Sequence, residues 1–355
     1  MSQRRASVIL CLSLLLLASA CGSESSAPGA GSDSSLTATL ADSGETYLLR
    51  DNLKPLGNIT SAISVEGNRL VVADDQPLVV LFEDHVMTRT FGRAGNGPCE
   101  YGGNSGLLGV TALDTSGDSL FVLINSQQKI ITFSLRSGEC LGETSHHGLL
   151  ARQYLERVAG GFLTGRSHYS SNTPDTTRIL SYLSDDETMV PVDLVLESID
   201  AAPTTIPIVI PGINFARHNN QIYAAFPFSQ VLAEVEVPSF KVHTHALHIE
   251  INREAFEEAE SNPGQDFAYI GQADIAGRIH ATNRWIAVST RRPRNGKEPL
   301  SKIYFQSPAG DPMGQQTLDD TPFALQGNRL MFIEPVRDPE SDYTYRVTYR
   351  EVTLQ

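Results

Sequence analysis

Short apolar runs that each follow a turn recur along the chain. GNRLVVAD at 67–74 returns as GNRLMFIE at 327–334, and weaker copies begin at positions 116, 159, 219 and 282. The first apolar residues of the six copies are Leu70, Leu120, Phe162, Ile222, Trp285 and Leu330. Their spacing of about 40–65 residues is typical of β-propeller blades with their loops.

Further strand-like runs flank each copy. They are rich in Val, Ile, Phe and Tyr, and Gly, Asn, Asp and Pro separate them. The clearest inner runs are 59–65, 108–113 and 323–325, the third runs are 78–82, 129–135 and 343–349, and the outer runs are 86–91 and 242–249. The one helix candidate, 253–260, provides no βαβ spacing. The pattern predicts an all-β chain of six four-stranded blades.

One β-rich segment has no partner in this count. Residues 36–49 alternate loosely before the first blade, whereas the last blade has only three strands of its own. If 36–49 is the outer strand of the sixth blade, the ring closes and two sheet edges are protected. We therefore predict a six-bladed β-propeller over 36–355, closed by its N-terminal strand. A pair of β-sandwiches is the alternative.

The first 35 residues have the features of an export signal and a tether. Arg4 and Arg5 precede apolar or small residues at 8–20, a stretch shorter than the roughly 20 residues of a membrane-spanning helix. This pattern predicts a signal peptide over 1–20. LASAC at 17–21 resembles a bacterial lipobox, which implies lipidation of Cys21; a plain secreted protein cut at the same bond is the alternative. Small and polar residues over 21–35 predict a flexible tether, roughly 20 Å in reach.

Composition and charge narrow the classes of partner. Hydrophobic residues make up 41% and charged residues 19% of the chain, which excludes wholesale disorder. The net charge of −14 excludes general nucleic-acid binding, which depends on Lys and Arg at phosphates. A lipid anchor at Cys21 would place the protein on a membrane of the bacterial cell envelope. The following Gly22 favours the outer membrane, facing the periplasm or the cell surface.

Cysteine usage points to one disulfide. After removal of the leader the chain keeps Cys21, Cys99 and Cys140, so lipidation of Cys21 leaves an even pair. Cys99 follows the expected outer strand of the first blade, and Cys140 begins that of the second. We predict a disulfide between them, because an exported protein meets an oxidising compartment. Two separate buried thiols are the alternative.

One segment carries a family resemblance. FGRAGNGPCEY at 91–101 resembles the FGxxGxGPGEF stretch of NHL-type propellers and their relatives, the TolB-like six-bladed lipoproteins of bacteria. Residues 113–138 are similar to the next blade of that family, so the close match covers about 50 residues. Cys99 stands where the family usually has Gly. The resemblance implies a six-bladed fold and an envelope location. Family members bind proteins, peptides or sugars and a few are enzymes, so it implies no single function.

Other suggestive motifs are interpreted as structural. Gly95–Gly97 lacks the GxxxxGK[ST] of a phosphate loop, and Ser105 lacks the GxSxG of a nucleophile elbow. His243 and His245 share one face of an expected outer strand, while His248 points to the other. Asp114–Asp118 is interpreted as a β-turn, because an EF-hand loop needs twelve residues. The sequence therefore assigns no catalytic residue, metal ligand or cofactor.

Two sets of residues are candidates for ligand contact. Polar residues on the expected inner strands or at their ends would line the central channel; they are Glu156, Arg217, His218, Asp274, Arg278, His280 and Asp320. A basic cluster, formed by Arg291, Arg292, Arg294 and Lys297, is expected on a hairpin loop of the fifth blade. It could contact phosphate head groups or acidic glycans, and a solvated turn at Asn295–Gly296 is the alternative.

Two functions are compatible with these features. The first is a binding or interaction scaffold on an envelope membrane, with a protein, peptide or glycan as its ligand. The second is a propeller enzyme at the channel, a metal-dependent lactonase-like or lyase-like hydrolase. The enzyme would need several carboxylate, Asn or His ligands converging on the axis.

Overall fold

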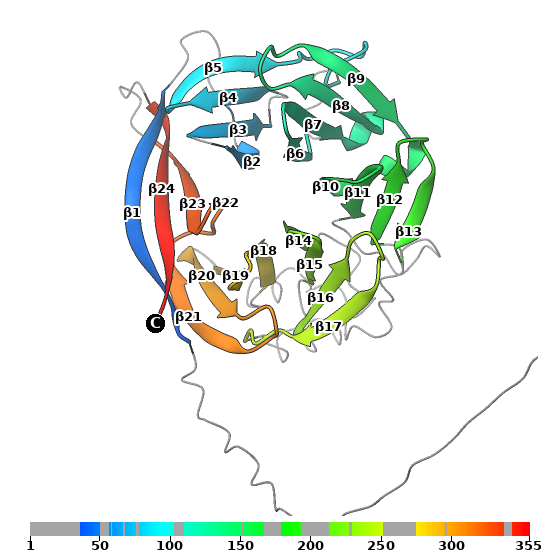
Figure 1. Cartoon of the computed structure of the whole chain (residues 1–355). Coiled ribbons are helices and arrows are strands. Elements are labelled where there is room, and N and C mark those ends of the chain that lie inside the picture. The colour runs from blue at the N-terminus through cyan, green and yellow to red at the C-terminus, as the bar shows by residue number, and fades with distance from the viewer. Residues whose placement is uncertain are drawn as a thin grey trace, which may run out of the picture. The chain divides into compact units, whose positions relative to one another are not determined.

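The chain folds into a ring of six four-stranded antiparallel sheets (Figure 1). The computed structural model describes residues 36–49, 57, 59–66, 68–75, 78–102, 110–150, 152–166, 179–192, 213–226, 229–250, 275–294, 297–336 and 343–355. The predicted six-bladed β-propeller is confirmed. The expected signal peptide, Cys21, the tether, the helix candidate at 253–260, Ser105 and Asp274 lie outside the described residues.

Each blade begins with its inner strand, next to the ring axis. Blade 1 contains β2 (Ile59–Val65), β3 (Arg69–Asp74), β4 (Val79–Glu83) and β5 (Val86–Phe91). Blade 2 contains β6 (Ala112–Ser116), β7 (Ser119–Ile124), β8 (Lys129–Ser134) and β9 (Cys140–Ser145). Blade 3 contains β10 (Arg152–Val158), β11 (Gly161–Arg166), β12 (Leu180–Ser184) and β13 (Met189–Val192).

The other three blades follow the same order. Blade 4 contains β14 (Asn214–His218), β15 (Gln221–Ala225), β16 (Val231–Glu236) and β17 (Val242–Ala246). Blade 5 contains β18 (Ile275–Ala281), β19 (Ile286–Arg294), β20 (Lys297–Gln306) and β21 (Pro312–Leu318). Blade 6 contains β22 (Ala324–Gln326), β23 (Arg329–Pro335), β24 (Tyr343–Leu354) and β1 (Ala38–Leu49). The described helices, η1 (Asn125–Gln127) and η2 (His147–Leu149), are single 3₁₀ turns. In this part of the chain no helix is long and apolar enough to cross a membrane.

The N-terminal strand closes the ring. β1 pairs antiparallel with β24 from Ala38↔Leu354 to Leu49↔Tyr343, so the first and last described strands share one sheet. Two backbone hydrogen bonds of 2.9 Å between Thr37 and Gln355 extend the pairing beyond the strands. Closure by the N-terminal strand is therefore confirmed, and both ends of the propeller lie in blade 6 (Figure 1).

The hydrophobic core lies between neighbouring blades. The middle strands are buried on both faces, as in β3 and β4, whereas the outer strand β5 alternates between exposed and half-buried positions. Five of the six anchor residues lie on the second strand of their blade, and Trp285 directly precedes the second strand β19. Trp285 is fully buried, and its Nε1–H donates a 2.8 Å hydrogen bond to Oδ1 of Asn328, which links blade 5 to blade 6.

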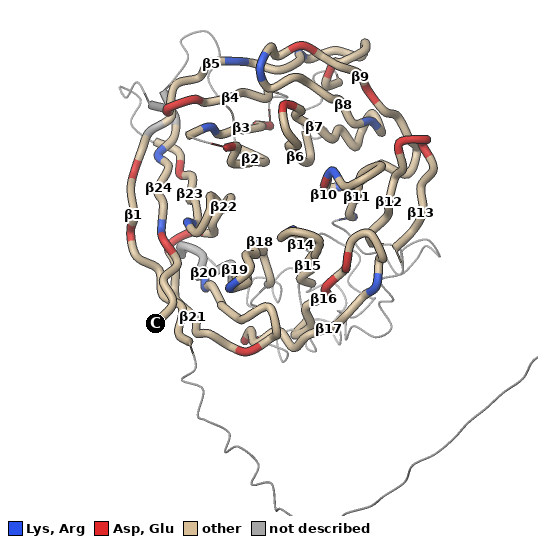
Figure 2. Tube along the Cα trace, in the orientation of Figure 1, with Lys and Arg blue, Asp and Glu red and all other residues tan. Residues whose placement is uncertain are grey.

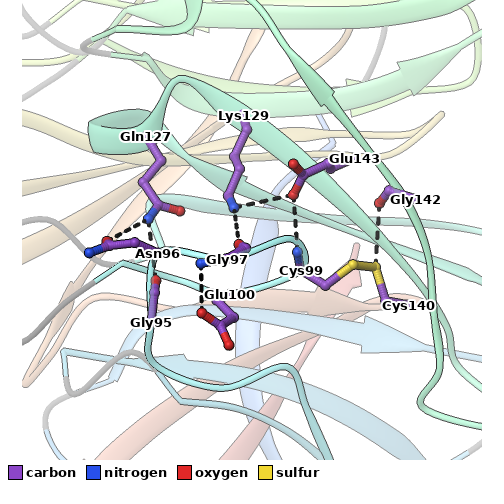
Figure 3. Close-up of polar contacts among 10 residues, drawn as sticks. All are labelled: Gly95, Asn96, Gly97, Cys99, Glu100, Gln127, Lys129, Cys140, Gly142 and Glu143. Atoms are coloured by element: carbon purple, nitrogen blue, oxygen red, sulfur yellow. Dashed lines mark hydrogen bonds and ion pairs between the residues drawn. A yellow bond between two sulfur atoms is a disulfide. The ribbon is translucent and has the colours of Figure 1, made fainter.

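A disulfide and several polar contacts fasten the connection between blades 1 and 2 (Figure 3). Cys99 is bonded to Cys140, the first residue of β9, as predicted. The backbone N–H of Cys99 donates to Oε2 of Glu143 at 3.0 Å, and Lys129 Nζ donates to the same oxygen at 3.2 Å. A Cβ at Gly95 would lie 2.0 Å from the Glu100 carboxylate, so a side chain cannot be placed there without displacing Glu100. The stretch that resembles the NHL-type motif is thus a fixed connector.

The basic cluster differs from its expected placement. Arg291, Arg292 and Arg294 belong to β19 and Lys297 begins β20, and the backbone pairs Arg294 with Lys297. These residues were expected in a loop, but the two strands continue to the tip of the hairpin, because the pairing that starts at Ile286↔Gln306 continues outward. Asp114 likewise lies on the inner strand β6, so the predicted turn is limited to the residues after Ser116.

Candidate functional site

A cavity of about 420 Å³ lies on the ring axis. All six blades contribute to its wall, through residues of β2, β6, β10, β14 and β18 and through Phe323, Ala324 and Leu325 at β22. Its volume falls within the range of small-molecule sites. Charged residues of both signs are spread around the ring, and β10 carries both signs beside the axis (Figure 2).

Two carboxyl groups lie on neighbouring inner strands. Asp114 on β6 and Glu156 on β10 each occupy the second position before the end of their strand, which places them at one level of the channel. Asp114 is buried, and one of its carboxyl oxygens accepts a short hydrogen bond from the backbone N–H of Arg157. The two strands of adjacent blades therefore place an acidic pair on the cavity wall.

Burial changes the protonation of this pair. Removal from water disfavours the charged form, and with the nearby charge of Glu156 it raises the pKa of Asp114 to about 8. Burial also raises the pKa of Glu156, while a hydrogen bond from Arg217 opposes that rise. At neutral pH Asp114 is consequently a mostly uncharged carboxylic acid beside the Arg-paired Glu156.

Arg217 on β14 completes this side of the wall. Its Nη1 lies 2.9 Å from Oε1 of Glu156 and also donates to the backbone carbonyl of Arg157 at 2.7 Å. Its Nε donates to the carbonyl of Asn219 at 2.6 Å. The guanidinium of Arg217 therefore has protein acceptors on both of its sides.

An aromatic pair lies beside the acidic groups. Tyr154 on β10 and Phe215 on β14 stack with ring centroids 4.7 Å apart. The hydroxyl of Tyr154 donates to Oε2 of Glu156 at 3.4 Å, and burial raises the pKa of Tyr154 well above its usual value. This corner of the cavity thus combines a flat apolar surface with charge.

The opposite side of the cavity carries a different cation. Arg278 on β18 stacks on Phe323, with its guanidinium carbon 3.9 Å from the ring centroid, and its Nη1 donates to the carbonyl of Phe323 at 2.9 Å. Among the described residues, no carboxylate lies within ion-pair distance of Arg278. Burial lowers the pKa of Arg278 to about 10. It remains a cation at neutral pH, with most of its N–H donors not engaged by the described part of the chain.

His280, two residues further along β18, is uncharged at neutral pH. Burial, together with the charge of Arg278, lowers the pKa of His280 to about 4. Its Nε2 lies 3.3 Å from the carbonyl oxygen of Pro322, to which it can donate. His280 therefore fixes the start of blade 6 without adding charge.

Sequence reasoning named some of these residues and missed others. Glu156, Arg217, Arg278 and His280 line the cavity. His218 is not on its wall; its ring contacts the side chain of Asn219. Asp320 is also outside the lining, and its carboxylate accepts a 2.7 Å hydrogen bond from the backbone N–H of Thr321. Asp114, Tyr154 and Phe215 were missed. Asp114 precedes the turn before Leu120, and this position could have placed it on an inner strand.

The histidine motif does not form a metal centre in the described residues. His245 Nε2 lies 2.6 Å from Oε2 of Glu234 on the neighbouring strand β16. Within the described ranges, no three His, Cys, Asp or Glu side chains are grouped so that they could hold a metal ion. The converging ligands that a metal-dependent channel enzyme would need are therefore not seen in this part of the chain.

Comparisons with known proteins support the fold alone. No family model and no curated protein matches the chain. An exported protein from Bacteroides fragilis is similar in structure, with a TM-score of 0.61 and 10% identity over 91% of this chain and 96% of that one. A member of the DUF4221 family from Bacteroides vulgatus also has a TM-score of 0.61, with 8% identity over 90% of this chain and 99% of its own. At such low identity these similarities extend only to the propeller architecture.

Proposed function

We propose that this protein is a lipoprotein of the bacterial cell envelope whose propeller binds a small polar ligand in the axial cavity. The observation that carries the proposal is the cavity of about 420 Å³, on whose wall Asp114, Glu156, Arg217 and Arg278 gather. A stable fold does not need four ionisable groups at one partly buried place, and such clusters concentrate at binding and catalytic sites.

The leader supports the envelope location. The signal-peptide pattern over 1–20 and the lipobox-like LASAC at 17–21 favour export and lipidation of Cys21. The exported protein of B. fragilis has the same architecture, which is consistent with that location. A membrane anchor at Cys21, followed by the tether at 22–35, would hold the propeller close to a membrane surface. The proposal includes sorting of the lipoprotein to the outer membrane. It also includes membership of the TolB-like or NHL-type propellers.

A channel enzyme is the second candidate. A carboxylic acid with a pKa near 8 beside a second carboxyl group that is paired with an arginine is an arrangement that general acid–base catalysis uses. The described residues provide no metal-binding group to go with it. Metal analysis of the purified protein tests the metal-dependent form of this candidate: a stoichiometric bound metal would favour it over the scaffold.

Ligand retention tests the proposed function. The purified full chain is incubated with a small-molecule extract of bacterial cells, washed, and its retained compounds are identified by mass spectrometry. A matched variant, Gln153→Trp, places a large side chain at an exposed position on the cavity wall. Compounds retained by the wild type and lost in this variant support the proposal. Equal retention by both proteins would contradict a ligand site in the cavity.

Anchoring is tested separately. Wild type should incorporate a radiolabelled fatty acid and partition with membranes, because Cys21 is the proposed acceptor. The Cys21→Ala variant should lose the label and leave the membrane fraction. Unchanged membrane association of that variant would show that Cys21 is not the anchor.

A further inference from the structure

The two charged sides of the cavity face each other across the ring axis. The inner strands follow the order β2, β6, β10, β14, β18 and β22 around the ring, so β6 of blade 2 is opposite β18 of blade 5 (Figure 1). Asp114 is the second residue before the end of β6, and Arg278 is the third before the end of β18. The two groups therefore come from inner strands on opposite sides of the axis.

Arg278 has the features of an anion receptor. Its guanidinium donates to one backbone carbonyl and stacks on Phe323, and no described carboxylate pairs with it. Arg217 is a natural comparison, because its guanidinium donates to Glu156 and to two backbone carbonyls. The charge of Asp320 acts on Arg278 and opposes the lowering of its pKa, but the two groups form no ion pair. A planar guanidinium binds a carboxylate through two parallel hydrogen bonds. A ligand carboxylate would therefore supply the paired counter-charge that the described residues do not give Arg278.

The acidic pair has the features of a cation receptor. Asp114 and Glu156 lie together on the wall. Among the described residues, Arg217 is the cation that acts on this pair, whereas the other contacting groups, Tyr154 and the backbone of Arg157, are neutral. Arg217 can balance one carboxylate but not two. A ligand ammonium would therefore allow Asp114 to ionise as well.

The width of the cavity sets the separation of the two ligand charges. Treated as a sphere, a volume of 420 Å³ is roughly 9 Å across. The ammonium and carboxylate of a single α-amino acid are too close together to reach both walls. An extended chain advances at most about 3.5 Å per residue, so the termini of a tripeptide are separated by up to about 10 Å.

We propose that the axial cavity binds a short peptide with free termini, with its ammonium at Asp114 and Glu156 and its carboxylate at Arg278. This inference rests on the proposed function, and it names the chemical class of the ligand. The stacked pair Tyr154 and Phe215 would provide a surface for the peptide between its two ends.

Proton release is a signature of this binding mode. With a pKa of about 8, Asp114 is about nine-tenths protonated at pH 7. An ammonium beside it favours the carboxylate, so a bound peptide should displace close to one proton from the protein. A peptide held elsewhere on the propeller would displace none from Asp114.

Calorimetry with three probes tests the inference. Triglycine, trialanine and trileucine are titrated into the full chain at pH 7, in phosphate and in Tris, whose different ionisation enthalpies reveal proton exchange. At least one tripeptide should bind, and its binding should release about 0.9 proton from the protein. Its N-acetyl form and its C-terminal amide should each bind about 10- to 100-fold more weakly, because each removes one charge. Free alanine should also bind much more weakly, since it cannot reach both walls.

Variants assign the two ends. Arg278→Gln should weaken tripeptide binding about 10- to 100-fold. It should also remove the difference in affinity between the free tripeptide and its C-terminal amide. Asp114→Asn should reduce proton release to near zero. Arg350→Gln is the matched control and should behave as wild type, because the ion pair of Arg350 with Asp42 joins β24 to the outer strand β1 and lies outside the cavity lining. Circular dichroism and Trp285 fluorescence confirm that each variant is folded.

Two kinds of failure can be told apart. If none of the tripeptides binds, while the wild type retains other compounds that the Gln153→Trp variant does not, the cavity is a ligand site and the peptide inference is wrong. If tripeptides bind equally well after N-acetylation or amidation, the inference is also wrong. If neither tripeptides nor extract compounds depend on the cavity, the proposed function fails with it.

Discussion

At the scale of single residues, the channel shows how one side-chain type acquires different properties. Arg217 has a carboxylate partner, whereas Arg278 has an aromatic ring and one carbonyl. Asp114 is pushed toward its neutral form by burial and by Glu156. These differences come from neighbours on adjacent blades, so they depend on how the blades pack against one another.

The raised pKa of Asp114 predicts a pH-dependent stability. A carboxyl group that keeps its proton in the folded state and loses it in the unfolded state destabilises the fold as pH rises from about 4 to 8. Between pH 6.5 and 8 wild type should lose about 2 kcal/mol relative to Asp114→Asn, which cannot ionise. His280 is neutral in the folded state throughout this range, and in the unfolded state it loses its remaining protons equally in both proteins, so it does not obscure the comparison.

Urea unfolding of both proteins at the two pH values provides the measurement, with Trp285 fluorescence as the probe. Arg350→Gln serves as a control whose stability should follow that of wild type with pH. A stability difference between wild type and Asp114→Asn that stays constant from pH 6.5 to 8 would refute the raised pKa.

Sequence reasoning could name Glu156, Arg217 and Arg278 because charged side chains on inner strands are expected to face the water-filled channel rather than the apolar packing between blades. It could not rank them, since the partners of each side chain belong to other blades. Asp114 was missed because DTSGD at 114–118 has the composition of a turn. Only the pairing Asp114↔Phe121 shows that the strand continues through this residue.

At the scale of elements, a disulfide and several hydrogen bonds fasten the connection between blades 1 and 2. The disulfide joins it to β9, and Lys129 and Glu143 hold its backbone from blade 2. Tyr101 donates a 2.7 Å hydrogen bond back to the carbonyl of Phe91, at the end of β5. The connector thus supports the packing between the two blades.

Removal of the disulfide should destabilise the propeller. A bond between residues 41 positions apart lowers the entropy of the unfolded chain, and the loop model gives about 4 kcal/mol. The double variant Cys99→Ala, Cys140→Ala should unfold at a lower urea concentration by a corresponding amount. In a Cys21→Ala background, thiol titration under denaturing, non-reducing conditions should find close to no free thiols. Two free thiols per chain would contradict the bond.

Strand positions were largely predictable, but the ends were predictable only for some strands. β2 and β5 begin and end at the expected residues, because alternation and bounding turns mark them clearly. The hairpin of β19 and β20 extends further than expected, since Arg-rich sequence has little strand propensity by itself. There the neighbouring strand, not local preference, decides where pairing stops.

At the scale of the whole molecule, closure between β1 and β24 makes the ring one structural unit. The contact joins residues near the two ends of the described chain, from Ala38↔Leu354 onward. The edge of β24 would otherwise expose its backbone hydrogen-bonding groups. The closure was predictable from the missing strand of the sixth blade, without knowledge of any side-chain contact.

Deletion of β1 should open the ring. A chain that lacks residues 38–49 loses the outer strand of blade 6 together with buried Ala38 and Leu48. We expect a marked fall in the urea midpoint and a less cooperative transition, with Trp285 fluorescence and far-UV circular dichroism no longer coinciding. Coincident transitions at the wild-type midpoint would show that β1 does not close the ring.

Hydrogen exchange with and without the tripeptide that binds in calorimetry tests most directly whether the axial cavity is the peptide site. We expect slower exchange in the inner strands β6, β10 and β18, and unchanged exchange in the outer strands β5, β9 and β13. Slower exchange confined to the outer strands, or unchanged exchange throughout at a saturating concentration of that tripeptide, would contradict peptide binding in the axial cavity.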